Sequence, residues 1–425
     1  MLDQLVQLAA LLFLVASGAY VAMLVVGRAR AAGIMQRSAE VETALLRANV
    51  DLVMDKRRFE AKRSELVWNG FRKFEIVRKQ QEGGGICSFY LQPHDKKPLP
   101  PFLPGQYLTF QLHIPGQRKP AIRCYSLSDS PNHPDYYRVS IKKVLPPRDK
   151  PDVPPGLSSS FFHDQLDEGD ILDVKAPGGH FFLDLTKPSP VVLIGGGVGL
   201  TPVLSMLNAI CESGSKRETW FLYGCRHGDD LVMRAHFDRI RREHDNVRIF
   251  IFYSDAREGI DEAGRDYDVG SRISVDWMKA NLPSSNYEYY LCGPPPFMES
   301  LVSGLEGWGV PEKDINFEAF GPATVKRTPA AQASAESAGA SKFQVTFAKS
   351  GKTVAWSPEI GSLLDFAEEN GVAIEFGCRA GNCGTCLTAI KVGDVTYVNP
   401  PGSPPEAGSC LACVSVPKSN LTLDA

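Results

Sequence analysis

The sequence predicts a multidomain protein of β and α/β structure, preceded by a long apolar helix. Three patterns support this fold class. An uncharged run covers Leu5–Val26, short alternating strands fill residues 68–144, and apolar strands alternate with helical stretches from about Pro190. Alternating strands are typical of antiparallel sheets, and strands that alternate with helices are typical of parallel ones. A chain of 425 residues has room for about three domains.

The N-terminal run is long enough to be a transmembrane helix, because it spans about 30 Å at 1.5 Å per residue. A cleaved signal peptide fits less well, since the leading residues carry Asp3 and no basic residue. Arg28, Arg30 and Arg37 follow the run. The positive-inside rule then puts the remaining domains in the cytoplasm, with a single-pass anchor at residues 1–27 in the inner (cytoplasmic) membrane. A buried helix of a soluble protein is the remaining alternative.

Residues 28–66 are charged, free of proline and rich in Ala, Leu, Arg and Glu. Val41, Leu45, Leu52 and Phe59 fall near helical spacing, which predicts a helical stalk. The heptads are too few and too impure to predict a coiled coil, and dimerisation through the stalk stays open.

Four further segments follow the stalk. Alternating strands predict an antiparallel β-barrel at residues 67–186, and buried apolar strands with intervening helices predict a parallel α/β domain at residues 187–322. Residues 323–341 are small and polar, which is typical of a flexible linker. Residues 342–425 combine two strands, a helix near 362–370 and a cysteine-rich loop, which predicts a small α+β domain.

The cysteine loop reads EFGCRAGNCGTC and sets Cys378, Cys383 and Cys386 at C-x4-C-x2-C spacing. This is the spacing with which plant-type ferredoxins hold a [2Fe–2S] cluster. Structural zinc often takes Cys/His mixtures, and no histidine lies within residues 342–425. We expect Arg379 to supply positive charge beside the anionic cluster.

Cys410 and Cys413 are both candidates for the fourth ligand by spacing alone. The stretch LACVSVP resembles the ferredoxin segment around the last ligand. That resemblance favours Cys413 and leaves Cys410 as a buried thiol.

A candidate flavin site begins with the segment Arg-Cys-Tyr-Ser at residues 123–126. An arginine there can pair with a pyrophosphate, a tyrosine can lie flat on a flavin ring, and a serine can reach flavin N5. A Pro-Gly-Gln-Tyr segment precedes it, and Gly-Leu-Ser-Ser opens a helix whose N–H groups can bind phosphate. The candidate ligands are Tyr107, Arg123, Cys124, Tyr125, Ser126, Gly156, Ser158 and Ser159.

A candidate dinucleotide site follows the strand VVLI, where a glycine-rich turn leads into a helix. This layout lets the backbone approach a pyrophosphate, although the turn is not the strict GxGxxG fingerprint. A second strand ends in CGPPPF, where a thiol can pack beside a nicotinamide; the alternative is an ordinary buried small residue. The candidate ligands are Gly196, Gly197, Val198, Gly199, Leu200, Thr201, Cys292, Gly293, Pro294 and Phe297.

In order and spacing these motifs resemble the ferredoxin–NADP reductase superfamily. The run from FRKFEIVRK through RxYSL, GGVGLTP, CGPPPF and FEAFGP is most similar to the reductase portion of flavohaemoglobins, over about residues 68–322. Residues 343–425 resemble plant-type ferredoxin domains, which implies a β-grasp fold. The resemblance also implies FAD as the flavin, NAD(P)H at residues 196–201 and 292–297, and Glu318 and Phe320 near the flavin ring.

The combination resembles the reductase components of oxygenase systems. It implies that electrons pass from NADH or NADPH through FAD and the cluster to an oxygenase, desaturase, cytochrome P450 or other haem protein. The candidate catalytic residues are Ser126 near flavin N5, and Cys292 with Glu318 around the nicotinamide. The alternatives are a respiratory or quinone-linked NADH dehydrogenase subunit, and an electron-transfer adaptor with a degenerate flavin half.

Two features of charge narrow the ligands further. A net charge of −3 excludes a strongly basic nucleic-acid-binding protein. Arg226 and Arg257 follow strand ends where a 2′-phosphate could lie, but Asp255 opposes that phosphate, so the sequence favours NADH.

Overall fold

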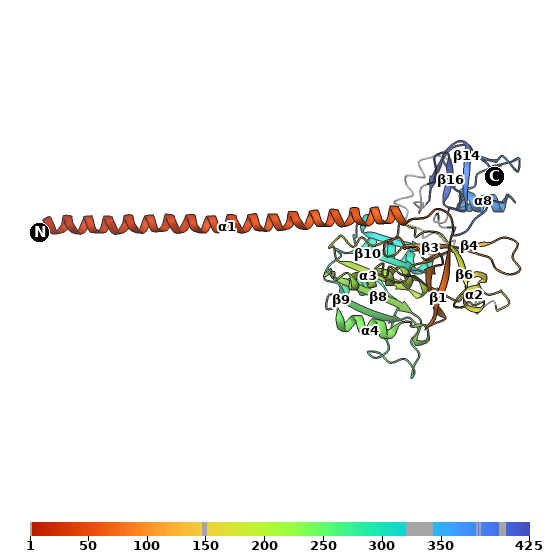
Figure 1. The fold of residues 1–425 in the computed structure, drawn as a ribbon, viewed down its shortest axis with the longest axis horizontal. Coiled ribbons are helices and arrows are strands. Elements are labelled where there is room, and N and C mark those ends of the chain that lie inside the picture. The colour runs from red at the N-terminus through yellow and green to blue at the C-terminus, as the bar shows by residue number, and fades with distance from the viewer. Residues whose placement is uncertain (1, 147–150, 320–342, 380, 382–383, 399–404) are drawn as a thin grey trace. The chain divides into compact units, whose positions relative to one another are not determined.

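The computed structural model describes residues 2–146, 151–319, 343–379, 381, 384–398 and 405–425 (Figure 1). The chain divides into two compact units, one ending at Lys62 and the other beginning at Arg63. Helix α1 (Leu2–Leu66) makes up the first unit, and its last turn belongs to the second. The second unit contains three larger sheets and a small two-stranded one.

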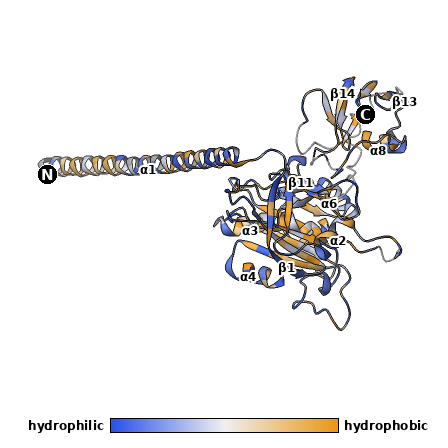
Figure 2. Ribbon diagram, turned by 45° about the vertical axis from the view of Figure 1, so that its right-hand side comes forward, coloured by the Kyte–Doolittle hydropathy of each residue, from blue (hydrophilic) through white to orange (hydrophobic). Residues whose placement is uncertain are grey.

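Helix α1 runs for 65 residues without a break. Its stretch Ala10–Arg47 contains an 18-residue window with a mean hydropathy of 2.3, and none of that window is buried. Phe13 and Met23 expose 74 % and 75 % of their surface. The first part of the helix is hydrophobic and the part toward Leu66 is hydrophilic (Figure 2). By length and composition, α1 is therefore able to cross a membrane.

The first large sheet of the second unit is antiparallel and has six strands in the order β4-β3-β6-β1-β2-β5. Alternate side chains such as Phe74, Phe89 and Phe110 are fully buried and form its core with helix α2 (Leu157–Asp164). The strands are β1 (Arg72–Gly83), β2 (Ile86–Pro93), β3 (Tyr107–Leu112), β4 (Ala121–Ser126), β5 (Tyr137–Lys142) and β6 (Ile171–Val174).

The sheet does not close into the predicted barrel. Its edge strands β4 and β5 meet through an isolated bridge between Leu127 and Val139 and a bond from Ser128 N to Arg138 O of 2.9 Å. The strand β4 ends at Ser126, where the chain turns into a polar loop instead of extending the ladder. The prediction of antiparallel strands is confirmed, and the prediction of a closed barrel is wrong.

The second sheet is parallel, with the order β11-β10-β7-β8-β9. Helices α3 and α4 contribute to the core on one face, and α5 and α6 to the core on the other. The strand order reverses between β7 and β10, and ligands of such sheets bind at the carboxyl edge of this switch point. The strands are β7 (Val191–Gly196), β8 (Thr219–Cys225), β9 (Val247–Tyr253), β10 (Glu288–Gly293) and β11 (Ile315–Ala319). The helices are α3 (Leu200–Glu212), α4 (Arg234–Glu243), α5 (Val275–Asn281) and α6 (Pro295–Gly307).

The third sheet, near the C-terminus, has the order β13-β12-β18-β14-β16, in which β12 and β18 run parallel. Helix α8 (Leu363–Glu369) begins with a capping box between Ser362 and Asp365 and contributes Leu364 and Phe366 to the core. These elements form the predicted α+β arrangement. The strands are β12 (Gln344–Phe347), β13 (Lys352–Ala355), β14 (Leu387–Val392), β16 (Ser409–Leu411) and β18 (Leu421–Leu423), with a separate pair β15 (Val395–Tyr397) and β17 (Ser415–Pro417).

Candidate functional site

Strand β4 carries the predicted flavin motif and differs from its neighbours in exposure. Its side chains from Ala121 to Tyr125 are half-buried, and only Ser126 is buried. Tyr125 packs edge-on against Phe162 of α2, with ring centroids 5.2 Å apart. Burial raises the pKa of Tyr125 well above its usual value, so the phenol is neutral. Ser126 lies opposite Tyr107 in the ladder. The strand therefore presents a fixed neutral ring and a partly open face, which suit a flat cofactor.

The N-terminus of α2 contains an unmatched polar group. Ser159 Oγ donates to Gly156 O at 3.0 Å and accepts from Val144 N at 3.1 Å. Ser158 Oγ is buried and has no partner among the described residues. Gly156 caps the helix without a side-chain hydrogen bond. A buried hydroxyl beside uncapped helical N–H groups fits a phosphate, as the FAD pyrophosphate would provide.

Tyr107 joins this site to the loop after β6. Its backbone exchanges two bonds of 3.0 Å with Gly178. A Cβ on Gly179 would lie 2.6 Å from the Tyr107 ring, so only glycine leaves space there. Arg123 NH1 binds the neighbouring Ile122 O at 2.7 Å, and Cys124 Sγ lies 3.3 Å from Thr109 Oγ1.

The glycine turn of the parallel sheet lies at the switch point. Gly197 has φ +57°, and a Cβ on Gly199 would lie 2.2 Å from Cys292 O. Helix α3 begins at Leu200 without a side-chain cap, and Thr201 Oγ1 donates to Val198 O at 3.2 Å. A glycine turn that leads into an uncapped helix at the switch point fits the pyrophosphate site that the sequence predicts.

Phe297 explains two of the predicted glycines. A Cβ on Gly196 would lie 3.0 Å from its ring, and one on Gly293 would lie 2.6 Å from it. Pro294 caps α6, which places Phe297 in the first turn of that helix. The two strand ends therefore need glycine so that the ring can pack against both.

Cys292 and Glu318 occupy paired positions on β10 and β11. Cys292 is fully buried, and burial keeps its pKa well above the usual value, so it remains a thiol. Glu318 Oε2 is buried without a partner among the described residues, and burial raises the pKa of this carboxyl to about 8. The two residues come together at the switch point, whereas Ser126 lies on the other sheet. Phe320 lies outside the described residues.

Among the candidate cluster ligands, Cys386 and Cys413 are close together. Their sulfurs lie 3.2 Å apart, and Gly381 N donates to Cys413 Sγ at 3.3 Å. Cys378 is half-buried. Cys383 lies outside the described residues.

Cys410 is in a different environment. It is completely buried on β16 opposite Thr388, and burial raises its pKa to about 11. The proximity of Cys413 to Cys386 supports Cys413 as the fourth ligand.

Arg379 differs from the sequence-based expectation. It has φ +53°, and its guanidinium pairs with Asp365 at 3.0 Å and with Glu368. It also lies 4.0 Å from the centroid of the Phe376 ring. Its charge is therefore matched by carboxylates of α8, and the residue ties the cysteine loop to that helix.

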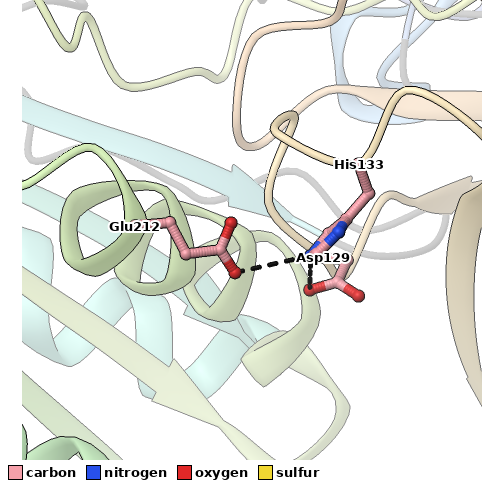
Figure 3. Close-up of side chains that lie close together, drawn as sticks. All are labelled: Asp129, His133 and Glu212. Carbon is pink, nitrogen blue, oxygen red and sulfur yellow. Dashed lines mark ion pairs between the residues drawn. The ribbon is translucent and has the colours of Figure 1, made fainter.

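Asp129, His133 and Glu212 form a cluster that the sequence did not reveal (Figure 3). His133 Nε2 lies 3.4 Å from Glu212 and 3.9 Å from Asp129. Their ligand atoms are near enough to suit a metal ion. However, Asp129 already accepts hydrogen bonds from several protein donors, Asn208 among them. The cluster is therefore a polar contact between the first two sheets.

At the ends of β8 and β9 the predicted cations are neutralised. Arg226 Nε lies 2.6 Å from Asp230, and Arg257 contacts both Asp229 at 2.6 Å and Asp261 at 3.1 Å. The hydrogen bonds from Arg257 lower the pKa of Asp261 to about 2. Both guanidinium groups are thus already paired with carboxylates, as the sequence-based preference for NADH requires.

Comparison with known families identifies each domain. Residues 73–183 match the oxidoreductase FAD-binding domain, residues 193–303 the oxidoreductase NAD-binding domain, and residues 345–418 the 2Fe-2S iron-sulfur cluster binding domain. The chain is an oxidoreductase of the ferredoxin reductase type, with a C-terminal [2Fe–2S] domain. The predicted FAD, NAD and cluster domains are confirmed.

Individual relatives agree with this class. The chain is 39 % identical over 264 residues to a flavohemoprotein of Bacillus thuringiensis subsp. konkukian, covering 62 % of this chain and 64 % of the relative. It is 38 % identical over 255 residues to the flavohemoprotein of Bordetella pertussis, covering 60 % and 61 %. The chain thus spans less than two thirds of these relatives.

Solved structures extend the likeness to the C-terminal domain. The FAD/NAD-binding domain of nitric oxide dioxygenase from Vibrio cholerae O1 biovar El Tor has a TM-score of 0.52 at 29 % identity and covers 60 % of this chain and all of that chain. Phthalate dioxygenase reductase has a TM-score of 0.50 at 26 % identity and covers 84 % of this chain and 98 % of that chain. That reductase transfers electrons from pyridine nucleotides to [2Fe-2S].

We predict that Cys413→Ser abolishes the visible absorption and the reduced-state EPR signal of the cluster, because the serine hydroxyl is a poorer ligand than thiolate. Cys410→Ser is the matched comparison, and it should retain both signals, since the sulfur contact of Cys386 in the described residues is with Cys413 at 3.2 Å. Loss of the cluster in Cys410→Ser together with its retention in Cys413→Ser would reverse the assignment.

Proposed function

We propose that the protein is a membrane-anchored NAD(P)H-dependent reductase that passes electrons through FAD and a [2Fe–2S] cluster to a separate redox protein. The observation that carries this proposal is the presence of FAD-, NAD- and cluster-binding domains in one chain. When bound, these groups supply hydride transfer from nicotinamide to flavin and one-electron transfer to the cluster.

The flavin is held by residues of two segments. Tyr125 provides the neutral ring against the cofactor plane, and Arg123 provides the charge for its pyrophosphate. Ser158 and the first N–H groups of α2 bind the same phosphates, since that hydroxyl is buried and unmatched. Ser126 hydrogen-bonds the reactive edge of the flavin from the end of β4.

The nicotinamide side is shaped by groups that keep their protons. Cys292 stays a thiol because it is completely buried. It therefore contributes a small packing surface to the nicotinamide pocket and does not act as a nucleophile. Glu318 retains its proton up to about pH 8 and can donate a hydrogen bond to a ligand at neutral pH. The glycine turn at residues 196–199 binds the pyrophosphate of the nucleotide.

The acceptor is an oxygenase or other haem or iron protein. Phthalate dioxygenase reductase supports this class of acceptor, because it is similar to this chain and is named as the reductase of a dioxygenase. The adaptor alternative with a degenerate flavin half is less well supported, since the FAD-binding match covers residues 73–183 and includes the motif of β4.

Helix α1 supports anchoring in a membrane. Its apolar side chains, among them Phe13 and Met23, are left exposed by the part of the chain that the structure describes. Burying such side chains in hydrocarbon is favourable by about 1.5–3 kcal/mol each. The three arginines that follow favour a cytoplasmic location for the second unit.

Rapid mixing of the oxidised protein with NADH should bleach the flavin first and reduce the cluster in a later phase. Cys386→Ser should abolish the second phase and leave flavin reduction intact, because the substitution removes a cluster ligand. Ferricyanide reduction, which can draw on the flavin directly, is the control and should persist in that variant. Flavin bleaching without later cluster reduction in the unmodified protein contradicts the proposed relay.

The nucleotide preference should be for NADH, with a kcat/KM at least about tenfold above that for NADPH. A 2′-phosphate needs an available cation, and carboxylates occupy Arg257. The double substitution Asp229→Asn with Asp261→Asn frees Arg257. It should lower the ratio of kcat/KM for NADH to kcat/KM for NADPH by about tenfold. Asp276→Asn on α5, 95 % exposed, is the matched control. A wild-type preference for NADPH contradicts this interpretation.

The membrane anchor is tested by charge in the middle of the apolar stretch. Leu14→Arg combined with Val21→Arg should release the protein into the soluble fraction, since each arginine near the centre of a span costs about 2.5–3.5 kcal/mol. The alanine versions of both positions should stay in carbonate-washed membranes. Recovery of the unmodified protein in the soluble fraction excludes the anchor.

A further inference from the structure

We propose that the Asp129–Asn208 contact is a positioning device that sets the flavin motif against the nicotinamide motif. The inference rests on the proposed function, because its consequence is the geometry of hydride transfer. Asp129 lies three residues after Ser126 of the flavin motif. Its partners Ser205 and Asn208 lie on α3, the helix that begins at the dinucleotide turn.

Asp129 is fixed on its own side by three donors. Tyr136 OH donates to Oδ2 at 3.1 Å, Arg138 NH1 lies 3.2 Å from the same oxygen, and Ser130 N donates to Oδ1 at 3.0 Å. The side chain of Asp129 is therefore immobile relative to the antiparallel sheet before any contact with α3 is counted.

Helix α3 binds the same residue twice. Ser205 Oγ donates to Asp129 O at 2.6 Å, and Asn208 Nδ2 donates to Asp129 Oδ1 at 3.1 Å. Ser205 and Asn208 are three residues apart and so share a helix face. All three residues are buried, with exposures of 8 % or less. Two directional bonds between buried groups fix both the distance and the rotation of α3.

The hydrogen bonds continue from Asn208 on α3 to α4. In this network the partner of each polar group shows which atom donates and which accepts. Because Asn208 Nδ2 faces Asp129, its Oδ1 accepts from His236 Nε2 at 2.7 Å. His236 Nδ1 then accepts from Arg239 NH2 at 3.0 Å. Burial lowers the pKa of His236 to about 4, which agrees with the neutral ring that this arrangement requires. The hydrogen-bond network therefore runs from α4 through α3 to Asp129, three residues after the flavin motif.

A second link at the surface is weaker. His133 and Glu212 are each 37 % exposed, and their side chains lie 3.4 Å apart. Exposed pairs of this kind contribute about 0–1 kcal/mol. The buried Asp129–Asn208 contact is therefore the stronger of these two links, and Glu212 offers a control position on the same helix.

Positioning matters here because hydride transfer requires reacting atoms about 3–3.5 Å apart, and a misplacement of 1 Å can cost about 100-fold in rate. Thr201 of the nucleotide turn precedes Ser205 by one helical turn. Since both motifs are joined to the contact by three or four residues of ordered backbone, a shift at Asp129 moves one cofactor site relative to the other.

The test uses the full-length protein loaded with FAD and cluster. Ser205→Ala with Asn208→Leu should lower the single-turnover rate of flavin reduction at saturating NADH by about 10- to 100-fold. The NADH dissociation constant and the FAD content should change less than twofold. The long-wavelength absorbance of stacked flavin and nicotinamide should weaken, and amide hydrogen exchange should rise at residues 127–130 and 200–208. Glu212→Gln should behave like the unmodified protein in each measurement.

Ser205→Ala alone removes one bond and leaves Asn208 in place, so it serves if the double variant does not fold. It should lower the reduction rate about threefold to fivefold. A folded Ser205→Ala variant with unchanged rate, absorbance and exchange overturns the proposal. Failure of the unmodified protein to reduce its flavin with NADH instead overturns the proposed function, and the exchange measurement still reports on the contact.

Discussion

A buried carboxylate, that of Asp129, joins the antiparallel sheet to helix α3 of the parallel sheet, and the alignment of the two sheets depends on this contact. Apolar packing already joins these sheets, because Ile86 and Phe181 share a core with residues of α3. Such packing is strong but non-directional. A charge as buried as that of Asp129 is stable only when donors surround it in fixed geometry. The carboxylate therefore adds direction to an interface that apolar burial alone would leave free to slide.

Asp129 has hydrogen-bond partners for its buried carboxylate, whereas some other buried polar groups have none among the described residues. Buried polar atoms usually find partners, so each exception in the described part of the chain needs an explanation. Ser158 and Ser160 on the first turn of α2, His227 at the end of β8 and Glu318 at the end of β11 are such exceptions, with Arg217 the fifth. Of these, the proposed function uses Ser158 for the flavin phosphates and Glu318 beside the nicotinamide.

The sequence predicted what depends on local pattern. Helix α8 lies within the predicted stretch 362–370, and the strands that carry the flavin and dinucleotide motifs fall where alternation or apolar runs placed them. The sequence-based predictions failed where contacts between residues far apart in the chain determine the structure. Asp129 and Asn208 are 79 residues apart, and the serine-rich segment around Asp129 reads only as a polar loop. The barrel prediction failed because strand periodicity does not report whether edge strands pair. Arg379 was assigned to the cluster because its carboxylate partners on α8 precede it by more than ten residues.

Helix α1 presents the opposite case, since its properties are almost entirely local. An isolated helix gains little stability in water from propensity alone, and most helices depend on an apolar face that packs against something. Residues 8–26 of α1 carry apolar or small side chains at nearly every position, so its apolar surface is not confined to one face. A helix that is hydrophobic all round requires an apolar medium on every side, which a bilayer supplies. If the acceptor lies in the same membrane, confinement to that surface raises its effective concentration near the reductase, and this advantage needs no tight binding between the two proteins.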